Sequence, residues 1–429
     1  MKRSRPLHWL VVLGIVLAAL PLMPAPAPDS GTTPATPAFN PEQATADYLA
    51  RLTPAEKARS DAYWNGGYWI RLIDLVITLA VAWLLLGSGL SRRMRALAER
   101  LSKRKPLQTF IYALQYIVVL FLLTFPFTVW VDFIREHRYN LSHQPFGQWL
   151  GEQFIDLAVS AVLLSILAVA MYGVIRKKPR TWWLWGSGVM ILFLMFLLLI
   201  QPVFIDPLFN RYTPMKEGPL KERILNLARA NAVPARDVLQ FDASRQTTRV
   251  SANVSGFLGT MRIALNDNLL NRCSPAEVAH VMAHETAHYV LNHIYESLIY
   301  FAILILAIGI FLERAFRGAL RRWGRRWGVR DAGDVAGLPL LVALLVLFLF
   351  AASPLLNTII RSNEVEADLF ALNAAREPDA AATVALKLGE YRKLDPSPLE
   401  EWLFYDHPSG RIRILTAMRW KAATADANR

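Results

Sequence analysis

The chain has 429 residues, 54% of them hydrophobic, and a positive mean hydropathy, a composition too apolar for a soluble protein and indicative of a polytopic membrane protein. The net charge of +13 does not indicate nucleic acid as a partner, because the Lys and Arg residues lie in short runs between apolar segments. The single cysteine, Cys273, excludes an internal disulfide and a thiolate cage for a metal.

The N-terminus resembles a secretory signal peptide. Basic residues at 2–5 precede an apolar run over residues 9–23, and a Pro-rich stretch covers residues 24–41. The apolar run is shorter than the roughly 20 residues that a membrane span needs, and proline follows the A-x-A candidate at residues 25–27. Cleavage and retention as an anchor therefore both stay open. We assign residues 1–66 to this signal-like or anchor segment and its linker.

Six longer apolar segments follow, each close to the length that a bilayer requires. The predicted spans are Tyr68–Leu90, Gln108–Val131, Phe154–Ile175, Trp182–Phe204, Leu298–Leu312 and Leu338–Ile360. The fifth is short, so we expect it to continue from the helix before it, and Pro354 predicts a kink in the sixth. Residues 67–204 are assigned to an N-terminal transmembrane domain.

Basic residues between the spans predict the orientation. The basic loops comprise residues 92–105, 176–180 and 314–330. The alternate loop near residues 132–152 carries only two arginines. Because Lys and Arg in short loops stay cytoplasmic, we expect the two long polar stretches, residues 205–296 and 361–429, to be extracytoplasmic.

Residues 205–429 are assigned to a second domain, which includes the last two spans. Two strand-like runs, Thr247–Val254 and Met261–Leu265, enclose a turn with Gly256 and Gly259. This pattern predicts a β-hairpin.

A helix with a well-marked start follows the hairpin. Ser274, Pro275 and Glu277 form the pattern of a capping box with proline at the first helical position. No helix breaker follows as far as His293, so we expect the helix to run to that residue. His280 and His293 are interpreted as residues that do not bind a metal.

This helix carries the strongest local signal, the H-E-x-x-H run at His284–His288. Positions four apart share one face of a helix, so both imidazoles can reach one metal ion while Glu285 projects beside it. Zinc accepts two neutral nitrogens and a carboxylate with a fourth position open to water, and a nearby carboxylate can take a proton from that water.

A two-histidine site needs a third ligand, and a polar cluster at Arg361–Asp368 directly follows the last span. We expect this cluster to open a second helix, with Glu364 and Asp368 on one face. Glu364 can bind the metal while Asp368 orients a ligand imidazole through its free N–H group, and Glu366 points elsewhere. Acidic residues at a helix start are also favoured by the helix dipole alone, so the cluster by itself is weak evidence.

A third cluster begins at Asp406 and ends at Arg413. His407, followed by a turn and cations, could donate to the oxyanion that forms when water adds to a peptide carbonyl. The same residues also fit an ordinary turn before a helix over Ile412–Lys421.

Together these motifs resemble the type-I CAAX prenyl endopeptidase family, membrane-embedded zincins that process prenylated precursors, and specifically its bacterial-type relatives. The match comprises H-E-x-x-H at 284–288, R-x-N-E-x-x-A-D at 361–368 and H-P-x-x-x-x-R at 407–413, with a similar segment at 204–214. The resemblance implies an all-α polytopic membrane protein, with about seven transmembrane helices around a chamber. It also implies a zincin-like α+β protease domain with a small β-hairpin or sheet.

The resemblance further implies one Zn²⁺ per chain, held by His284, His288 and Glu364. It implies Glu285 as the general base, Asp368 and Asn363 as supports behind the ligands, His407 and Arg413 as substrate or oxyanion contacts, and Asn253 beside a substrate strand. The expected protein is thus a zinc metalloendopeptidase of a bacterial inner membrane, acting on peptides or proteins that are prenylated or membrane-associated.

Three other interpretations stay open. One is a membrane quality-control protease of broad specificity, which the sequence does not separate from prenyl-peptide processing. Another is a transporter or channel with an incidental H-E-x-x-H, but Arg71, Asp74, Asp132 and Asp156 lie near span ends rather than mid-span, which disfavours it. The third is a scaffold with a structural metal, which would not need the carboxylate of Glu285.

Overall fold

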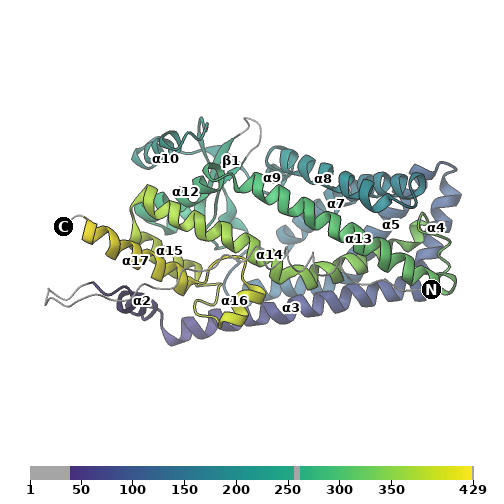
Figure 1. Ribbon diagram of the computed structural model, residues 1–429, viewed down its shortest axis with the longest axis horizontal. Helices are drawn as coiled ribbons and strands as arrows, with labels where there is room; N and C mark the ends of the chain where they lie inside the picture. Colours follow the sequence, from purple (N-terminus) through teal and green to yellow (C-terminus); the bar gives the residue numbers. More distant parts are fainter. Residues whose placement is uncertain (1–38, 256–260, 428–429) are drawn as a thin grey trace, which may run out of the picture. The chain divides into compact units, whose positions relative to one another are not determined.

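The computed structural model describes residues 39–255 and 261–427, and its elements belong to the unit Asn40–Arg429 (Figure 1). The signal-like segment and the turn glycines Gly256 and Gly259 lie outside the described residues. The predictions made for them therefore stay predictions.

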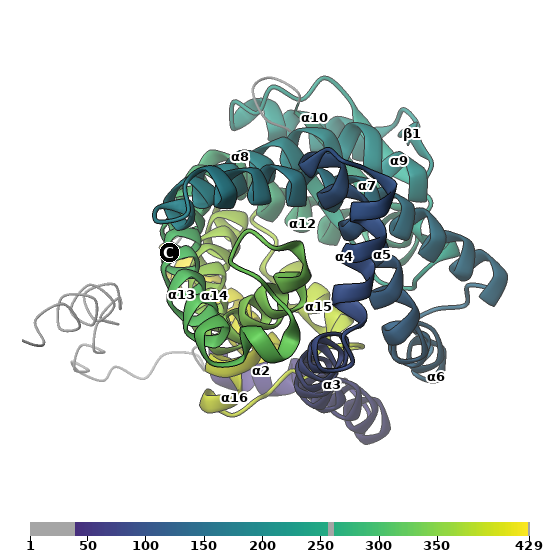
Figure 2. The same cartoon turned by 90° about the vertical axis from the view of Figure 1, so that its right-hand side faces the viewer.

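Six helices in the described part of the chain are long and apolar enough to cross a membrane. They are α3 (Pro54–Gly87), α5 (Lys105–Thr128), α7 (Phe146–Lys177), α8 (Trp182–Ile200), α13 (His293–Trp327) and α14 (Leu338–Ala375). They coincide with the six predicted spans, which are confirmed. Figure 2 shows these helices arranged around a common axis. Trp83, Leu122 and Ile303 are exposed on them, as residues facing lipid would be.

Two expectations about helix boundaries were wrong. The helix that carries the H-E-x-x-H run, α12 (Pro275–Val290), ends before His293, and the fifth span does not continue from it. Asn292 has φ 61°, a left-handed conformation that ends the regular helix and lets α13 begin in a new direction. The polar cluster at 361–368 does not open a second helix either, because α14 runs through Pro354 and the cluster without interruption.

The basic stretches after α3, after α7 and along α13 meet at one end of the bundle. Much of the first is a short helix, α4 (Leu90–Leu101), and much of the third is the last part of α13. Arg95 on α4 forms an ion pair with Asp334, and Arg317 on α13 donates to the carbonyl of Pro179 at 3.1 Å. Helix α12 lies toward the opposite end (Figure 1). The three basic stretches therefore lie on the same side of the bundle, as the prediction of orientation requires. The orientation in the membrane stays a prediction.

Shorter elements connect the long helices. They are α2 (Pro41–Leu49), a π-helical turn (Val129–Arg135), α6 (Glu136–Arg138), a second π-helical turn (Gln201–Ile205) and α9 (Asp206–Phe209). The predicted boundary between residues 66 and 67 lies inside α3, and the one between 204 and 205 lies inside the second π-helical turn. The division into domains stays a prediction.

A four-stranded sheet follows in the order β1-β2-β4-β3. The strands are β1 (Tyr212–Pro214), β2 (Val238–Phe241), β3 (Ala252–Ser255) and β4 (Arg262–Asn266). Antiparallel β3 and β4 form the predicted hairpin, with Asn253 opposite Ala264. Strand β3 is shorter than predicted because the preceding residues bond elsewhere: the amide of Thr248 donates to the carbonyl of Leu141 at 3.0 Å.

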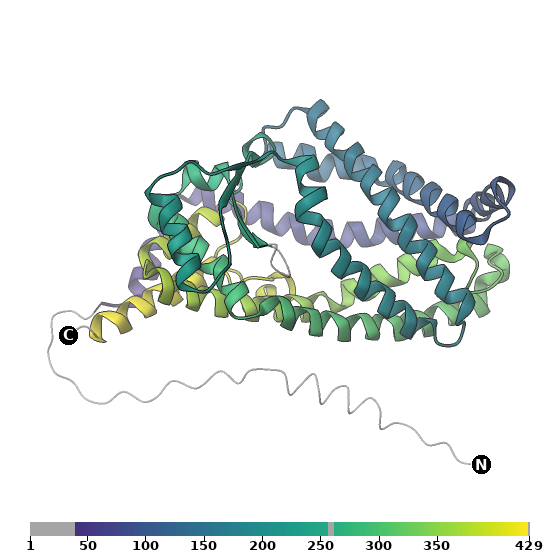
Figure 3. The same cartoon turned by 90° about the horizontal axis from the view of Figure 1, so that it is seen from above.

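The sheet packs against α12 and two shorter helices, α10 (Pro219–Ala230) and α11 (Asp267–Arg272). Their shared core contains buried Ile224, Val238, Ile263, Leu265, Leu269, Val278 and Met282. A 3₁₀ turn at Ala243–Arg245 follows β2. Figure 3 shows the sheet region in teal at one end, from which the long helices extend.

The C-terminal helices are α15 (Pro378–Leu388), α16 (Pro398–Phe404) and α17 (Gly410–Ala427). A core of Tyr48, Leu372, Ala382, Ile414 and Met418 joins α15 and α17 to α2 and α14. The expected helix over Ile412–Lys421 lies within α17. A helical membrane protein with a small sheet next to the motif helix confirms the predicted fold class.

Candidate metal centre

Helix α12 is fixed at its start and along one face. The capping box is present, because the Ser274 hydroxyl accepts from the Glu277 amide and the Glu277 carboxylate accepts from the Ser274 amide. Val278 and Met282 are buried against the sheet core. The helix also packs on α14, so the side chains between these two faces have little freedom to move.

Three predicted metal ligands converge between α12 and α14. His284 Nε2 lies 3.3 Å from His288 Nε2 and 3.1 Å from Glu364 Oε2, and His288 Nε2 lies 3.5 Å from Glu364 Oε1. Tetrahedral zinc with ligand bonds of about 2.0–2.2 Å places its ligand atoms roughly 3.3 Å apart. The donor set and these separations therefore fit a zinc ion. Within the described residues this is the group that could hold a metal, and His280 is not part of it.

Asp368 contacts the ring nitrogen of His284 that does not contact the other ligands. Its Oδ1 is 3.0 Å from His284 Nδ1, which leaves Nε2 of that imidazole facing the ligand cluster. Arg413 donates to both oxygens of Asp368 at 2.7 Å and lies 3.5 Å from Glu364. Arg413 thus contacts two carboxylates of the site, that of Asp368 and that of the proposed ligand Glu364. Its predicted contact with an oxyanion stays a prediction.

Glu285 faces a cleft of about 230 Å³ beside the ligand cluster. Burial and the nearby charge of Glu364 raise the pKa of Glu285 to about 7, although His284 and Arg413 act in the opposite direction. The cleft is also lined by His407 and by Ser251 and Ala252 at the start of β3. A carboxylate in this position of the cleft can accept and return a proton.

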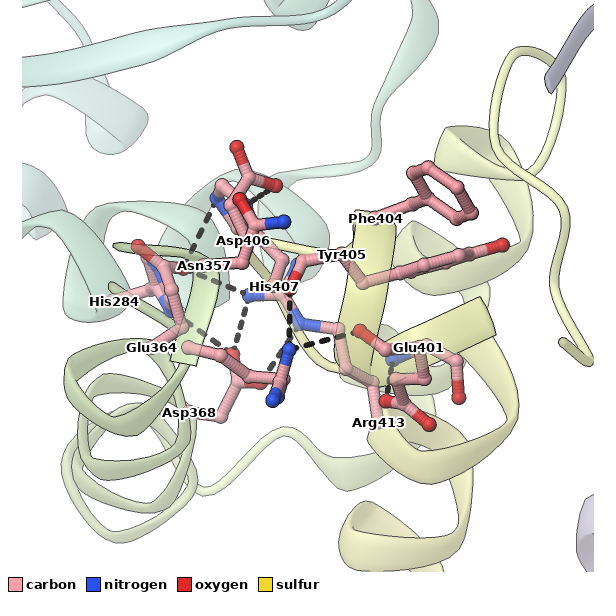
Figure 4. Close-up of polar contacts among 12 residues, drawn as sticks. His284, Asn357, Glu364, Asp368, Glu401, Phe404, Tyr405, Asp406, His407 and Arg413 are labelled. Atoms are coloured by element: carbon pink, nitrogen blue, oxygen red, sulfur yellow. Dashed lines mark hydrogen bonds and ion pairs between the residues drawn. The ribbon is translucent and has the colours of Figure 1, made fainter. Parts of the chain in front are cut away.

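His407 reaches the ligand cluster from the segment between α16 and α17. Its Nε2 lies 3.2 Å from Glu364 Oε2, and its Nδ1 donates to Asp406 Oδ1 at 2.8 Å (Figure 4). Burial would raise the pKa of Asp406, but the bond from His407 lowers it to about 2. Asp406 therefore remains ionised and orients the imidazole. No role was predicted for Asp406, although a carboxylate directly before the histidine was a signal for one.

Helix α14 also holds the chain that carries His407. Arg361 donates to the carbonyls of Glu401, at 3.0 Å, and of Tyr405, and Asn357 donates to the carbonyl of Leu403 at 2.7 Å (Figure 4). These bonds to the last turn of α16 were not predicted. Arg361 belongs to the second motif. Its partners could not be predicted, because every residue has a backbone carbonyl and no particular side chain is needed to accept the bond.

The two predicted asparagines occupy different places. Asn363 is buried and lines an apolar cavity of about 300 Å³ together with His288 and Glu364. Asn253 lies in β3, one of the two edge strands of the sheet, directly after the residues that line the cleft. Their functional roles stay predictions.

The bundle and this site define the class of the protein: a multi-pass membrane metalloendopeptidase. Residues 214–421 match peptidase family M48, and residues 40–211 match the CAAX prenyl protease N-terminal domain of five membrane helices. The chain belongs to family M48 and, within it, to the CAAX prenyl protease group. The resemblance found in the sequence is confirmed.

Among its relatives, the uncharacterized metalloprotease YhfN of Bacillus subtilis is 29% identical over 373 residues, which cover 86% of this chain and 87% of that protein. The CAAX prenyl protease 1 homolog of Oryza sativa subsp. japonica is 30% identical over 294 residues, which cover 66% and 67%. The crystal structure of S. mikatae Ste24p superposes with a TM-score of 0.72 at 20% identity, covering 88% of this chain and 95% of that one. This last similarity shows the fold.

Proposed function

We propose that the chain is a zinc-dependent endopeptidase in which His284, His288 and Glu364 hold the ion and Glu285 is the general base. One observation carries this proposal: side-chain atoms of the three ligand residues lie 3.1–3.5 Å apart, and one of these residues, His284, lines the same cleft as Glu285. A bound zinc ion would act as a Lewis acid: it would lower the pKa of a bound water to about 7 and polarise the peptide carbonyl.

The side chains of the cleft perform the proton transfers. Glu285 takes a proton from the attacking water and returns it to the nitrogen of the leaving peptide. His407, bonded to Asp406, and Arg413, bonded to Asp368, line the same cleft, and we assign them as donors to the charge that develops on the carbonyl oxygen. Donors fixed in advance stabilise that charge more than they stabilise the neutral carbonyl, so they favour the transition state.

Strand β3 offers a place for the peptide backbone. It is one of the two edge strands of the sheet, and Ser251 and Ala252 at its start line the cleft. A substrate in extended conformation would add to the sheet at Asn253 through main-chain hydrogen bonds. Main-chain pairing is independent of side-chain identity, so specificity must come from the pockets beside the ligands.

The apolar cavity beside the ligands supports a substrate with a large apolar substituent. Its apolar lining includes Leu198, Leu298, Phe301 and Ile360, next to His288 and Glu364. Relatives that carry the name CAAX prenyl protease 1 support a prenyl group as that substituent. We therefore infer that the enzyme processes prenylated peptides of the CAAX type in preference to unmodified ones.

Zinc content and cleavage of a matched peptide pair test this proposal. The full chain in detergent should contain one zinc, and Glu364→Ala should lose it. A farnesylated peptide should be cleaved with a kcat/KM at least about tenfold above that of the same peptide without the lipid, because burying a large apolar group is worth several kcal/mol.

Phe301→Ala, which enlarges the cavity, should reduce this preference. Ile303→Ala is the matched control, because Ile303 lies on the same helix and is exposed rather than in the cavity. Equal cleavage of both peptides would instead favour a quality-control protease of broad specificity. Zinc retained in Glu364→Ala would remove Glu364 from the ligand set.

A further inference from the structure

The third histidine near the ligand cluster, His293, contacts His288 directly. Their Nδ1 atoms lie 3.0 Å apart, and Nε2 of His293 lies 3.3 Å from Oε2 of Glu366. His293 is the first residue of α13 and is buried, with 3% of its surface exposed. The left-handed Asn292 lies between α12 and α13, and the turn there brings His293 against His288. The motif alone did not predict this contact.

His288, His293 and Glu366 form a row of contacts, and hydrogen bonding allows one consistent placement of the protons along it. Binding a metal through Nε2 requires the neutral imidazole of His288 to carry its proton on Nδ1. That N–H can then donate only to Nδ1 of His293, which must accept and therefore carries its own proton on Nε2. The Nε2–H group of His293 in turn donates to the carboxylate of Glu366. Every polar atom in the row then has a partner of the correct kind.

We propose that His293 and Glu366 are positioning residues that fix the tautomer and ring orientation of His288 for metal binding. This inference rests on the proposed zinc site. Outer partners of metal-bound histidines raise the basicity of the ligand and hold its ring in place. The first ligand, His284, has such a partner directly in Asp368, whereas His288 reaches its carboxylate through a second imidazole.

Both carboxylates come from α14, two residues apart in sequence, and they have different surroundings. The side chain of Asp368 is 12% exposed and is neutralised by Arg413, whereas that of Glu366 is 62% exposed. Water can therefore replace Glu366 more easily than it can replace His293, which is enclosed. The effect of removing His293 should exceed the effect of removing Glu366.

Zinc affinity of the full chain in detergent tests the proposal, measured by competition with a chromophoric chelator. His293→Phe keeps a ring of similar shape but removes the acceptor, and should weaken zinc binding about 10–100-fold. His293→Gln can accept from His288 and donate to Glu366, so it should restore most of the affinity. Glu366→Ala should weaken binding by a smaller factor. Visible spectra of the Co²⁺-substituted protein should shift in His293→Phe and return toward wild type in His293→Gln.

Two controls match the chemistry of these changes. His137→Phe removes an imidazole that bonds only to the carbonyls of Phe133 and Gln144, and Glu296→Ala removes a carboxylate that bonds to Tyr300 on α13. Neither should change zinc affinity or the Co²⁺ spectrum.

The possible results separate this inference from the proposed function. Wild-type protein that binds no zinc would overturn the proposed site itself. Wild-type protein that binds zinc, with His293→Phe equal in affinity and spectrum, would overturn only the role of His293. If His293→Phe does not fold, Glu366→Ala decides, because its side chain is largely exposed: wild-type affinity there contradicts the proposal, and a loss supports it.

Discussion

Asp368 is bound at both carboxylate oxygens by Arg413 and at the same time faces His284 Nδ1 at 3.0 Å. One carboxylate thus connects α14, α12 and α17, three elements that are distant in sequence. The guanidinium fixes the plane of the carboxylate, since two parallel N–H···O bonds leave it one orientation. The imidazole of His284 is then held with Nε2 toward Glu364 and His288.

Asp368→Asn tests this arrangement. An amide keeps the shape but loses the charge that accepts from both Arg413 and His284, so zinc affinity should fall about 10–100-fold, with a parallel loss of peptidase activity at limiting zinc. Chelator competition measures the first and a peptide assay the second. Asp395→Asn is the control. Asp395 also pairs with an arginine, Arg411, which is two residues before Arg413 in the sequence, but both side chains of that pair are exposed. Unchanged zinc affinity in Asp368→Asn would contradict the role given to Asp368.

Glu285→Gln separates proton transfer from metal binding. The amide occupies the same space in the cleft and leaves the three ligands in place, so zinc content should equal that of the wild type. Turnover should fall by about 10²–10⁴-fold, the usual contribution of a general base. Metal analysis and single-turnover kinetics on the same preparation check both points. Activity above about a hundredth of the wild type would exclude Glu285 as the base.

His407→Ala probes the carbonyl side of the cleft. Contacts to a developing oxyanion strengthen only in the transition state, so kcat should fall more than KM rises. Asp406→Asn should show a weaker effect of the same kind, because it disturbs only the orientation of the imidazole. A change confined to KM would make His407 a substrate-binding residue, and no change would return it to a role in the turn before α17.

The parts of the site that the sequence predicted share a local origin. His284 and His288 are four apart on one helix, and Glu364 and Asp368 are four apart on another, so helical geometry alone placed each pair on one face. The six spans followed from apolar length in the same way. Contacts between distant segments were different. The pair Asp368–Arg413 and the bonds from Arg361 to the end of α16 depend on how α14 meets the C-terminal residues.

The errors in the helix boundaries have a physical origin as well. Asn292 adopts the left-handed conformation that asparagine tolerates, and asparagine commonly ends helices, so its position before His293 was a stop signal that the prediction did not use. The cluster at 361–368 was predicted to begin a helix because its composition changes from apolar to polar. Composition reports where the membrane ends, whereas the backbone hydrogen bonds of α14 continue across that boundary.

The ion pair between Glu277 and Lys387 predicts a pH-dependent stability. Lys387 donates to the Glu277 carboxylate and to the carbonyl of Arg272, each at 2.7 Å, and thereby joins α15 to the start of α12. Burial would raise the pKa of Glu277, but the bond from Lys387 and the amide of Ser274 lower it below the usual glutamate value. A lowered pKa stabilises the fold above the unfolded-state value and stops doing so as the pH falls through the folded-state value.

Lys387→Met should therefore destabilise the protein by about 1–3 kcal/mol at neutral pH, since it leaves a buried carboxylate without its cation. The difference in Tm between wild type and variant should shrink in acid, below the usual range of glutamate. Thermal unfolding in detergent across pH measures this. In the Glu277→Gln background, where this carboxyl cannot ionise, the change in Tm caused by Lys387→Met should not depend on pH. A Tm difference that is constant with pH would exclude ionisation of Glu277 as its cause.

The last prediction concerns orientation in the membrane. The three basic stretches meet at the end of the bundle formed by α4 and the segment after α13, joined by the contacts Arg95–Asp334 and Arg317–Pro179, while α12 lies toward the other end (Figure 1). Lys and Arg flanking the spans remain on the cytoplasmic side, so the metal centre and the C-terminus should be extracytoplasmic.

Alkaline phosphatase fused after residue 427 should be active, whereas the same reporter inserted at Lys178–Arg180, between α7 and α8, should be inactive. A reporter that works only in the cytoplasm should give the opposite pair of results. The reversed pattern would place the metal centre in the cytoplasm and contradict this prediction.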